Sequence, residues 1–197
     1  MSQPSEWITT THDWGQTVDR AHLEQMRAAI TAPDTGGRRH LILKVLAYAQ
    51  DEAAASGRTG TVVITYRADG SVIVDDDGRG TDTRRDEHGT MIRKPVMATP
   101  DVRFTDPDNA PLLPDGLPRR GMSSVAAASD TLVHENHRDT GSWSQTYRFG
   151  LPDDALAAVE SRKHSGTVVT FHADIAGPAR LTESDLHAFP DIHIAVH

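Results

Sequence analysis

The first predicted helix is marked by apolar positions that repeat at helical spacing. Leu23, Met26 and Ile30 are separated by three and four residues, which places them on one face of a helix over residues 19–30. Asp19 stands where this repeat begins, and its carboxylate is suited to accept a hydrogen bond from the first free backbone amides. We therefore expect an amphipathic helix with an acidic N-cap.

A second helix and two groups of strands follow along the chain. Residues 40–57 contain strong helix formers throughout and end at Gly57, a residue type that commonly follows the last helical turn. Ala-Asp-Gly at residues 68–70 is a turn signal between two runs rich in β-branched residues, which predicts a hairpin. The expected strands cover residues 61–67, 71–76, 131–137, 142–150 and 166–174, and a third helix covers residues 120–129.

The order of these elements predicts one domain with a long connection. Residues 82–119 are polar and rich in Pro and Asp, so we expect a long loop or lid there, of a kind that is often functional. Residues 1–18 are interpreted as an N-terminal arm, and residues 19–197 as a single domain. The element order indicates an α+β two-layer sandwich, with helices on one face of a mixed, mainly antiparallel sheet.

The composition narrows the classes of function. The chain has 197 residues and a formal net charge of −8, which argues against direct nucleic-acid binding because such proteins usually carry a basic surface. It contains no cysteine, which excludes disulfides, thiol catalysis and cysteine-ligated zinc. Without a long apolar run or a signal pattern, we expect a cytoplasmic protein with no membrane contact. The histidines, including His134 and His137, are interpreted as surface residues, and no metal site is expected.

Four sequence blocks occur in the order and at the spacing of one known family. HLILKVLAYAQDEAAA resembles the helix motif E-x-x-D-N-A-x-D-E-A of the DNA gyrase B ATPase domain, and SVIVDDDGRG matches V-x-D-D-G-R-G. GLPRRGMSSVAAAS is similar to the lid motif G-L-H-G-V-G-x-S-x-V-N-A-L-S, and HSGTVVTF is similar to T-G-T-x-x-x-F. The resemblance implies the GHKL, or Bergerat, fold. The second domain of gyrase B has no counterpart in these residues, so a stand-alone, degenerate relative is expected.

The resemblance implies that the part of the pocket that recognises adenine is retained. In the family, the aspartate of D-x-G-R-G accepts a hydrogen bond from the exocyclic amine of adenine, and the matching residue is Asp76. Thr167 would support this carboxylate through its hydroxyl, and Gly78 and Gly80 would let the backbone approach the ligand closely. A buried acceptor discriminates for a donor because leaving it unpaired costs free energy. The alternative is a solvated turn at the end of the hairpin.

The residues that activate water and hold Mg²⁺ in the family are replaced. Lys44 stands at the position of the catalytic glutamate, and a protonated lysine cannot polarise the attacking water. Tyr48 and Ala47 replace the Mg²⁺-binding asparagine and the aspartate before it, although Mg²⁺ prefers hard oxygen ligands. Arg119 and Arg120 occupy the middle of the lid, where the family has small residues that wrap phosphates. ATP hydrolysis and bound Mg²⁺ are therefore not expected, and an adenine nucleotide is retained only as a candidate ligand.

One helix face and the altered lid supply the remaining candidate contacts. Lys44, Tyr48 and Asp51 lie at i, i+4 and i+7, a face that the resemblance turns toward the pocket. Glu52 and Arg79 match a family pair that forms a salt bridge at the pocket mouth, although an ordinary surface pair is the alternative. The added cations would suit an anionic ligand without a metal. The residues expected to bind a ligand are Lys44, Tyr48, Glu52, Asp76, Gly78, Arg79, Gly80, Arg119, Arg120, Gly121 and Thr167.

Four functions stay open on the sequence alone. The first is a pseudo-ATPase or binding module that holds a small molecule or nucleotide in the former ATP pocket, for example as a decoy for gyrase-directed antibiotics. The second is a repurposed enzyme, in which Asp76, Lys44, Tyr48 and Asp51 perform acid–base chemistry such as a cyclisation or isomerisation of a natural product. The others are a working ATPase with a different base and a module that binds a partner protein or forms a homodimer.

Overall fold

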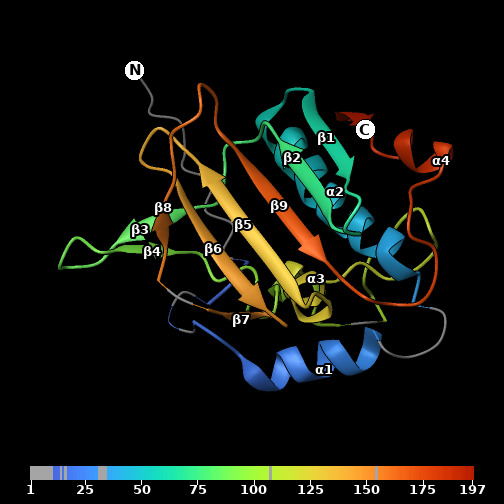
Figure 1. Cartoon of the computed structure of the whole chain (residues 1–197), viewed down its shortest axis with the longest axis horizontal. Coiled ribbons are helices and arrows are strands. Elements are labelled where there is room, and N and C mark those ends of the chain that lie inside the picture. Colours follow the sequence, from blue (N-terminus) through green and yellow to red (C-terminus); the bar gives the residue numbers. More distant parts are fainter. Residues whose placement is uncertain (1–10, 14, 16, 31–34, 107, 154) are drawn as a thin grey trace.

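The chain folds into two layers, a long sheet with helices packed against one of its faces (Figure 1). The computed structural model describes residues 11–13, 15, 17–30, 35–106, 108–153 and 155–197. The predicted α+β sandwich with a mainly antiparallel sheet is confirmed. Of the predicted arm, residues 1–10, 14 and 16 lie outside the described residues.

The main sheet has eight strands in the described part of the chain, in the order β10-β1-β2-β9-β5-β6-β7 with β8 paired to β6. Neighbouring strands are antiparallel except β1 and β10, which run parallel. The predicted strands are confirmed, with small differences at their ends. The strands are β1 (Gly60–Tyr66), β2 (Val72–Asp76), β5 (Thr131–His137), β6 (Trp143–Arg148), β7 (Leu151–Pro152), β8 (Ala157–Ala158), β9 (Gly166–His172) and β10 (Ile192–Val196).

Helix α2 forms the centre of the second layer. Its side chains from His40 to Ala47 are all buried, because the helix contacts β1, β2 and β10 on one side and α3 on another. A helix that is buried on nearly all sides needs no polar stripe, which explains the apolar run in its sequence. The helices are α1 (Arg20–Ile30), α2 (Gly37–Ser56), α3 (Met122–Ala128) and α4 (Glu183–Leu186).

The start of α1 and the end of α2 are as predicted, whereas α2 begins at Gly37, three residues before the predicted start. The backbone N–H of His22 donates to the Asp19 carboxylate at 3.0 Å, so Asp19 acts as the N-cap of α1. Helix α2 ends at Ser56, and the backbone N–H of Gly57 donates to the carbonyl of Ala54 at 3.1 Å. Helix α1 packs on α3, where Leu23 and Met26 contact Ala127 in a second, smaller core.

The segment expected to be a long loop contains short regular elements. Strands β3 (Thr83–Arg85) and β4 (Met91–Arg93) pair as a separate antiparallel hairpin, and a 3₁₀ helix η1 (Val102–Phe104) follows. Between β4 and η1, the side chain of Met97 is only 1% exposed and belongs to the main hydrophobic core. The segment is thus fastened to the domain at its middle, beside the end of α2.

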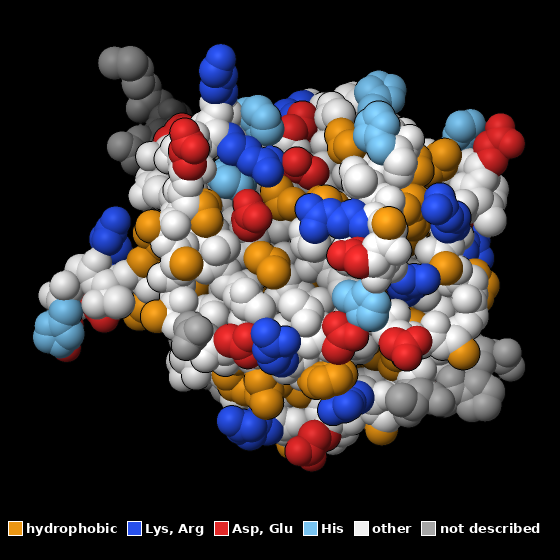
Figure 2. Space-filling view, viewed as in Figure 1, with side chains coloured by type: hydrophobic (Ala, Val, Ile, Leu, Met, Phe, Trp, Pro, Cys, Tyr) orange, Lys and Arg blue, Asp and Glu red, His pale blue; other side chains and the backbone are white. Residues whose placement is uncertain are grey.

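The surface carries charges of both signs. On the face that Figures 1 and 2 share, Lys and Arg side chains are interspersed with Asp and Glu (Figure 2). None of the helices in the described part of the chain combines the length and the apolar character that a membrane span requires.

Candidate functional site

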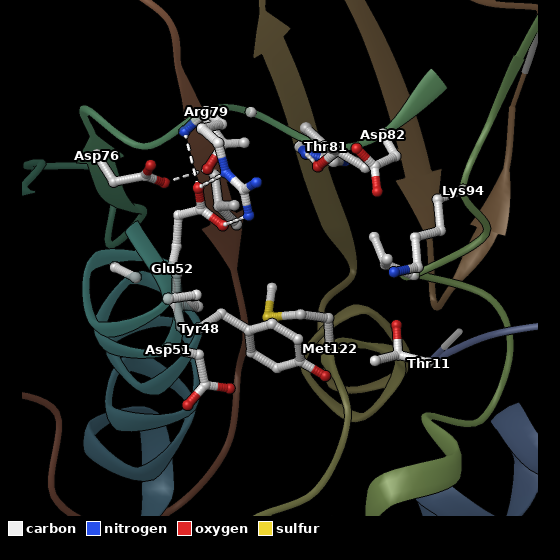
Figure 3. A pocket seen from close by; sticks show the side chains of 18 of the residues that line it. Thr11, Tyr48, Asp51, Glu52, Asp76, Arg79, Thr81, Asp82, Lys94 and Met122 are labelled. Carbon is white, nitrogen blue, oxygen red and sulfur yellow. Dashed lines mark hydrogen bonds and ion pairs between the residues drawn. The ribbon is translucent and has the colours of Figure 1, made fainter. Parts of the chain in front are cut away.

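A cavity of about 520 Å³ lies between α2, the loop after β2 and the segment that connects β4 to η1 (Figure 3). Sheet residues Asp76, His134, Thr167 and Val169 contribute to its wall, as does Met122 at the start of α3. Small-molecule sites commonly have volumes of about 300–1,000 Å³. The cavity is therefore large enough for a compact organic ligand.

Asp76 presents a supported carboxylate to one end of this cavity. The register of β2 and β9 places Asp76 directly opposite Thr167, whose hydroxyl donates to Asp76 Oδ2. The backbone N–H of Gly78 donates to Asp76 Oδ1 at 2.8 Å. Burial raises the pKa of Asp76, and the hydrogen bonds from Thr167 and Gly78 oppose that rise. The carboxylate is thus held in place by donors while it faces the cavity as an acceptor.

The glycines after Asp76 are needed for close packing. A Cβ atom on Gly78 would lie 2.8 Å from Asp76 Oδ1 and 2.9 Å from Glu52 Cγ, closer than real contacts allow. Gly80 has φ of 79°, and a Cβ there would lie 2.6 Å from Asn136 Oδ1. Gly80 lines the main cavity, whereas Gly78 lines only a small neighbouring one. Gly80 thus lets the loop fold tightly over the end of β5, and Gly78 lets it pass close to Glu52 of α2.

The ion pair expected between Glu52 and Arg79 is present at the same end of the cavity. Arg79 Nη2 donates to Glu52 Oε2 at 3.0 Å, and the backbone N–H of Arg79 donates to Glu52 Oε1 at 3.2 Å. Both residues line the cavity (Figure 3). Because 60% of the Arg79 side chain is exposed, the pair contributes little to folding stability and mainly fixes the loop.

The other end of the cavity is closed by a network of five side chains, Tyr48, Asp51, Asp101, Arg103 and Arg119, which we call the closing network. The Tyr48 hydroxyl donates to Asp101 Oδ2 at 2.6 Å. Arg103 bridges the two carboxylates, with Nη2 at 2.8 Å from Asp101 Oδ2 and Nη1 at 2.9 Å from Asp51 Oδ2. Arg119 forms a two-pronged pair with Asp51, at 2.6 and 3.0 Å. Each charged group thus has an internal partner.

The electrostatics of the closing network favour its present protonation state. Burial raises the pKa of Tyr48, and Asp101 raises it further, so the hydroxyl stays a donor. Burial works to raise the pKa of Asp101, but hydrogen bonds from Arg103 and Tyr48 outweigh it and hold this pKa below its usual range. A ligand that took one member of this network would leave its partner without an ion pair, which is costly in a partly buried site.

The residues at this end do not fit the Mg²⁺ ion that the family uses. Ala47 has no side-chain oxygen, and the Tyr48 hydroxyl is directed to Asp101. The carboxylates of Asp51 and Asp101 are occupied by guanidinium groups. Among the described residues, no group of three or more His, Asp or Glu side chains is arranged to hold a metal.

Five of the candidate contacts lie outside the cavity wall: Lys44, Gly78, Arg119, Arg120 and Gly121. Lys44 is only 2% exposed, and its pKa is lowered to about 7, chiefly by burial and secondly by Arg120, while Asp115 opposes the shift. The structure therefore brings seven candidate residues to one cavity but not these five; the seven are Asp76, Gly80, Thr167, Glu52, Arg79, Tyr48 and Asp51.

Several cavity residues were not found from the sequence. Thr11, Lys94, Arg103 and His134 line the cavity, yet three of them come from irregular segments that no periodic pattern marks. The interpretation of His134 and His137 as surface residues is wrong, because they are 2% and 3% exposed. On β5, His134 is in phase with the buried residues Leu132 and Asn136, whereas His137 is out of phase with them and is buried at the end of the strand.

His134 belongs to the cavity wall as a neutral ring. Its ring centre lies 5.0 Å from that of Trp143 in an edge-to-face arrangement, and its Nε2 lies 3.2 Å from the Thr81 hydroxyl. Burial lowers the pKa of His134 to about 3. The ring therefore offers a polar edge and an apolar face without charge.

The chain is similar to bacterial DNA gyrase and DNA topoisomerase 4 proteins. It is 32% identical to the DNA gyrase B protein of Streptomyces coelicolor over 139 residues, which are 70% of this chain and 20% of that protein. It is 29% identical to the DNA topoisomerase 4 B protein of Staphylococcus epidermidis over 146 residues, which are 74% of this chain and 22% of that protein. The chain spans about a fifth of the length of these curated relatives. No protein-family model matches it.

A solved structure shares the fold. The topoisomerase IV ATP-binding domain of Francisella tularensis, in complex with a small-molecule inhibitor, superposes with a TM-score of 0.59 at 21% identity, covering 84% of this chain and 79% of that one. The motifs, the sheet and these similarities agree, and the chain is accordingly a relative of the GHKL ATP-binding domains of DNA gyrase B and topoisomerase IV B.

Proposed function

We propose that this protein binds a small molecule through the Asp76 end of the cavity, independently of a metal, and does not hydrolyse ATP. The observation that carries the proposal is the contrast between the two ends. At one end Asp76 faces the cavity as a supported acceptor. At the other end the closing network satisfies its own charges.

Recognition rests on an N–H donor of the ligand. Thr167 and Gly78 already donate to Asp76, so its remaining lone pairs require a donor from the ligand. A charge-assisted hydrogen bond in a partly buried site is strong, and an unpaired carboxylate there is costly. The Francisella relative is named for ATP binding. For this chain we carry over only the recognition of an adenine-like amine.

The absence of hydrolysis rests on the groups that replace the family's machinery. Lys44 stands in place of the glutamate that would activate water, and it is buried outside the cavity wall. Asp51 is the acid of α2 that lies at that end, and it is bound by Arg103 and Arg119. A carboxylate held by two guanidinium groups is a poor general base because its lone pairs are already engaged by donors.

The test is calorimetric titration of the wild type and the Asp76→Asn variant with adenosine. We expect Asp76→Asn to weaken binding by about 10- to 100-fold, the equivalent of one charged hydrogen bond. Because burial raises the pKa of Asp76, a neutral amide is tolerated there, and the variant should unfold at a temperature close to that of the wild type.

Asp75→Asn is the matched control. Asp75 is the neighbour of Asp76 on β2, points to the opposite face of the sheet and pairs with Arg162 at 2.9 Å. It should leave adenosine affinity unchanged. The proposal fails if the wild type does not bind adenosine, if both variants behave alike, or if the wild type releases phosphate from ATP at a rate that Asp76→Asn abolishes.

A further inference from the structure

Among the described residues, each charged side chain that lines the cavity has an ion-pair partner, with two exceptions. The pairs are Glu52 with Arg79, Asp51 with Arg103, and Asp82 with Arg138. The exceptions are Asp76, which accepts from uncharged donors, and Lys94. A cavity with one unmatched anion and one unmatched cation is complementary to a ligand with a donor at one end and an anion at the other.

Lys94 is held in the cavity wall by its backbone. It follows β4, and its N–H donates to the carbonyl of Asp82 at 3.1 Å. Its side chain is partly buried, and among the described residues its ammonium has neither a hydrogen bond nor an ion pair. Burial lowers the pKa of Lys94, although Asp82 and Asp101 oppose the shift from a distance. Such an ammonium has lost part of its hydration without gaining a partner, so the binding of an anion beside it is favourable.

The placement of Lys94 suits a ligand that spans the cavity. Figure 3 shows Lys94 on the wall opposite Asp76 and Glu52, with Met122 between the two walls. The same cavity is also lined by the apolar side chains of Val45, Val96, Met97 and Val169. A flat or hydrophobic body would cover this surface and leave its polar ends to the two charged groups.

We propose that Lys94 is the anion-binding residue of this site, so that the ligand carries a single carboxylate or phosphate-type group at the end remote from its N–H donor. The inference rests on the proposed function. It also replaces the cations expected from the sequence, because Arg119 is bound to Asp51 and Lys44 is buried outside the wall. A single ammonium matches one anionic group better than a triphosphate.

The experiment uses three adenine probes with the same two-carbon linker at N9. One ends in a carboxylate, one in the uncharged carboxamide and one in a phosphonate. Their affinities are measured by calorimetry without added metal for the wild type, Lys94→Met, Lys94→Arg and Asp76→Asn. Lys163→Met, at an exposed site, controls for the loss of one positive charge.

We expect the wild type to bind the carboxylate or the phosphonate at least about tenfold more tightly than the amide, the size of one charge-assisted contact. Lys94→Met should remove this preference, Lys94→Arg should keep most of it, and Lys163→Met should change nothing. The stronger of the two anionic probes identifies which acid the site takes.

The failures are distinguishable. The inference is overturned if all three probes bind the wild type equally, or if Lys94→Met keeps the preference for the anionic probes. In either case, a loss of all binding in Asp76→Asn would still support the proposed function. If no probe binds the wild type, the proposed function is contradicted, and the inference falls with it.

Discussion

The two ends of the cavity differ in whether their charged groups already have partners within the protein. At the Asp76 end, protein donors orient a carboxylate and leave part of it for a ligand. At the Tyr48 end, two carboxylates and two guanidinium groups satisfy one another, and the phenol completes the set. In the first arrangement the carboxylate has no ion-pair partner within the described protein, whereas in the second every charged group has one. A binding site is recognised by such an unpaired group more than by the presence of charged residues.

The comparison also indicates which parts of such a pocket can vary in chemistry while the fold stays the same. The Asp76 end is built from the register of β2 and β9, which the sheet maintains. The other end is built from α2 and from loop residues such as Asp101 and Arg103, whose side chains can be exchanged without altering the sheet. Changes of chemistry are therefore tolerated more readily at the second end.

The largest expected effect concerns Lys44, which aligns with the catalytic glutamate of the gyrase B motif and is buried in α2. The folded-state pKa of Lys44 is about 7, well below that of an exposed lysine, so the unfolded state binds more protons between pH 7 and 10. The free energy of unfolding of the wild type should therefore rise with pH in this window, by up to about 1.4 kcal/mol per pH unit relative to Lys44→Met. Urea unfolding at pH 7, 8 and 9 measures the difference.

Exposed Lys163 supplies the control for Lys44. The Lys163→Met variant should follow the wild-type pH dependence, which separates burial from a change of net charge. Equal slopes for the wild type and Lys44→Met would contradict a buried, deprotonating lysine. The wild type and Lys44→Met should bind adenosine with the same affinity, because Lys44 does not line the cavity.

A second, smaller effect separates the two acids that follow one another on α2. Asp51→Asn leaves Arg119, whose side chain is 10% exposed, without its ion-pair partner, and should lower the free energy of unfolding by about 1–3 kcal/mol. Glu52→Gln weakens only an exposed pair with Arg79 and should cost less than about 1 kcal/mol. Chemical denaturation of the two variants under one condition makes the comparison. Equal losses in the free energy of unfolding would mean that the closing network stabilises the fold no more than an exposed ion pair does.

The smallest expected effect is that of the Tyr48 hydroxyl. Tyr48→Phe removes a 2.6 Å hydrogen bond, but Asp101 keeps its pair with Arg103, so we expect a loss of stability of about 1 kcal/mol. The adenosine affinity should not change, because the phenyl ring still contributes to the wall. A tenfold loss of affinity would show that the hydroxyl contacts the ligand and that the closing network opens.

Much of the fold was predictable because its signals are local. Helix α2, the hairpin of β1 and β2, and strand β5 each carry a strong pattern of apolar residues or helix formers, and the structure confirms them. Strand β10 was missed because its five residues become a strand only by pairing in parallel with β1. The three-residue strands β3 and β4 are too short to show a period.

The residues of the candidate site can also be divided into those that the sequence identified and those that it did not. Asp76 and the Glu52–Arg79 pair were found through the resemblance to the gyrase B motifs, and the structure places all three residues on the wall of one cavity. Lys94 and Arg103 were not found, because they come from a segment without regular period, and their importance depends on which charges find partners. Arg119 was noticed in the lid motif, but no sequence pattern reveals that Asp51 occupies it.

The central claim is that the two ends of the cavity no longer act together on a metal-bound triphosphate. The most direct test is the affinity of the wild type for ATP, measured by calorimetry once with Mg²⁺ and once with EDTA. The account predicts the same affinity in both, because the oxygen groups of the closing network are already paired with donors of the protein. Binding that tightens tenfold or more with Mg²⁺, accompanied by release of phosphate, would contradict it.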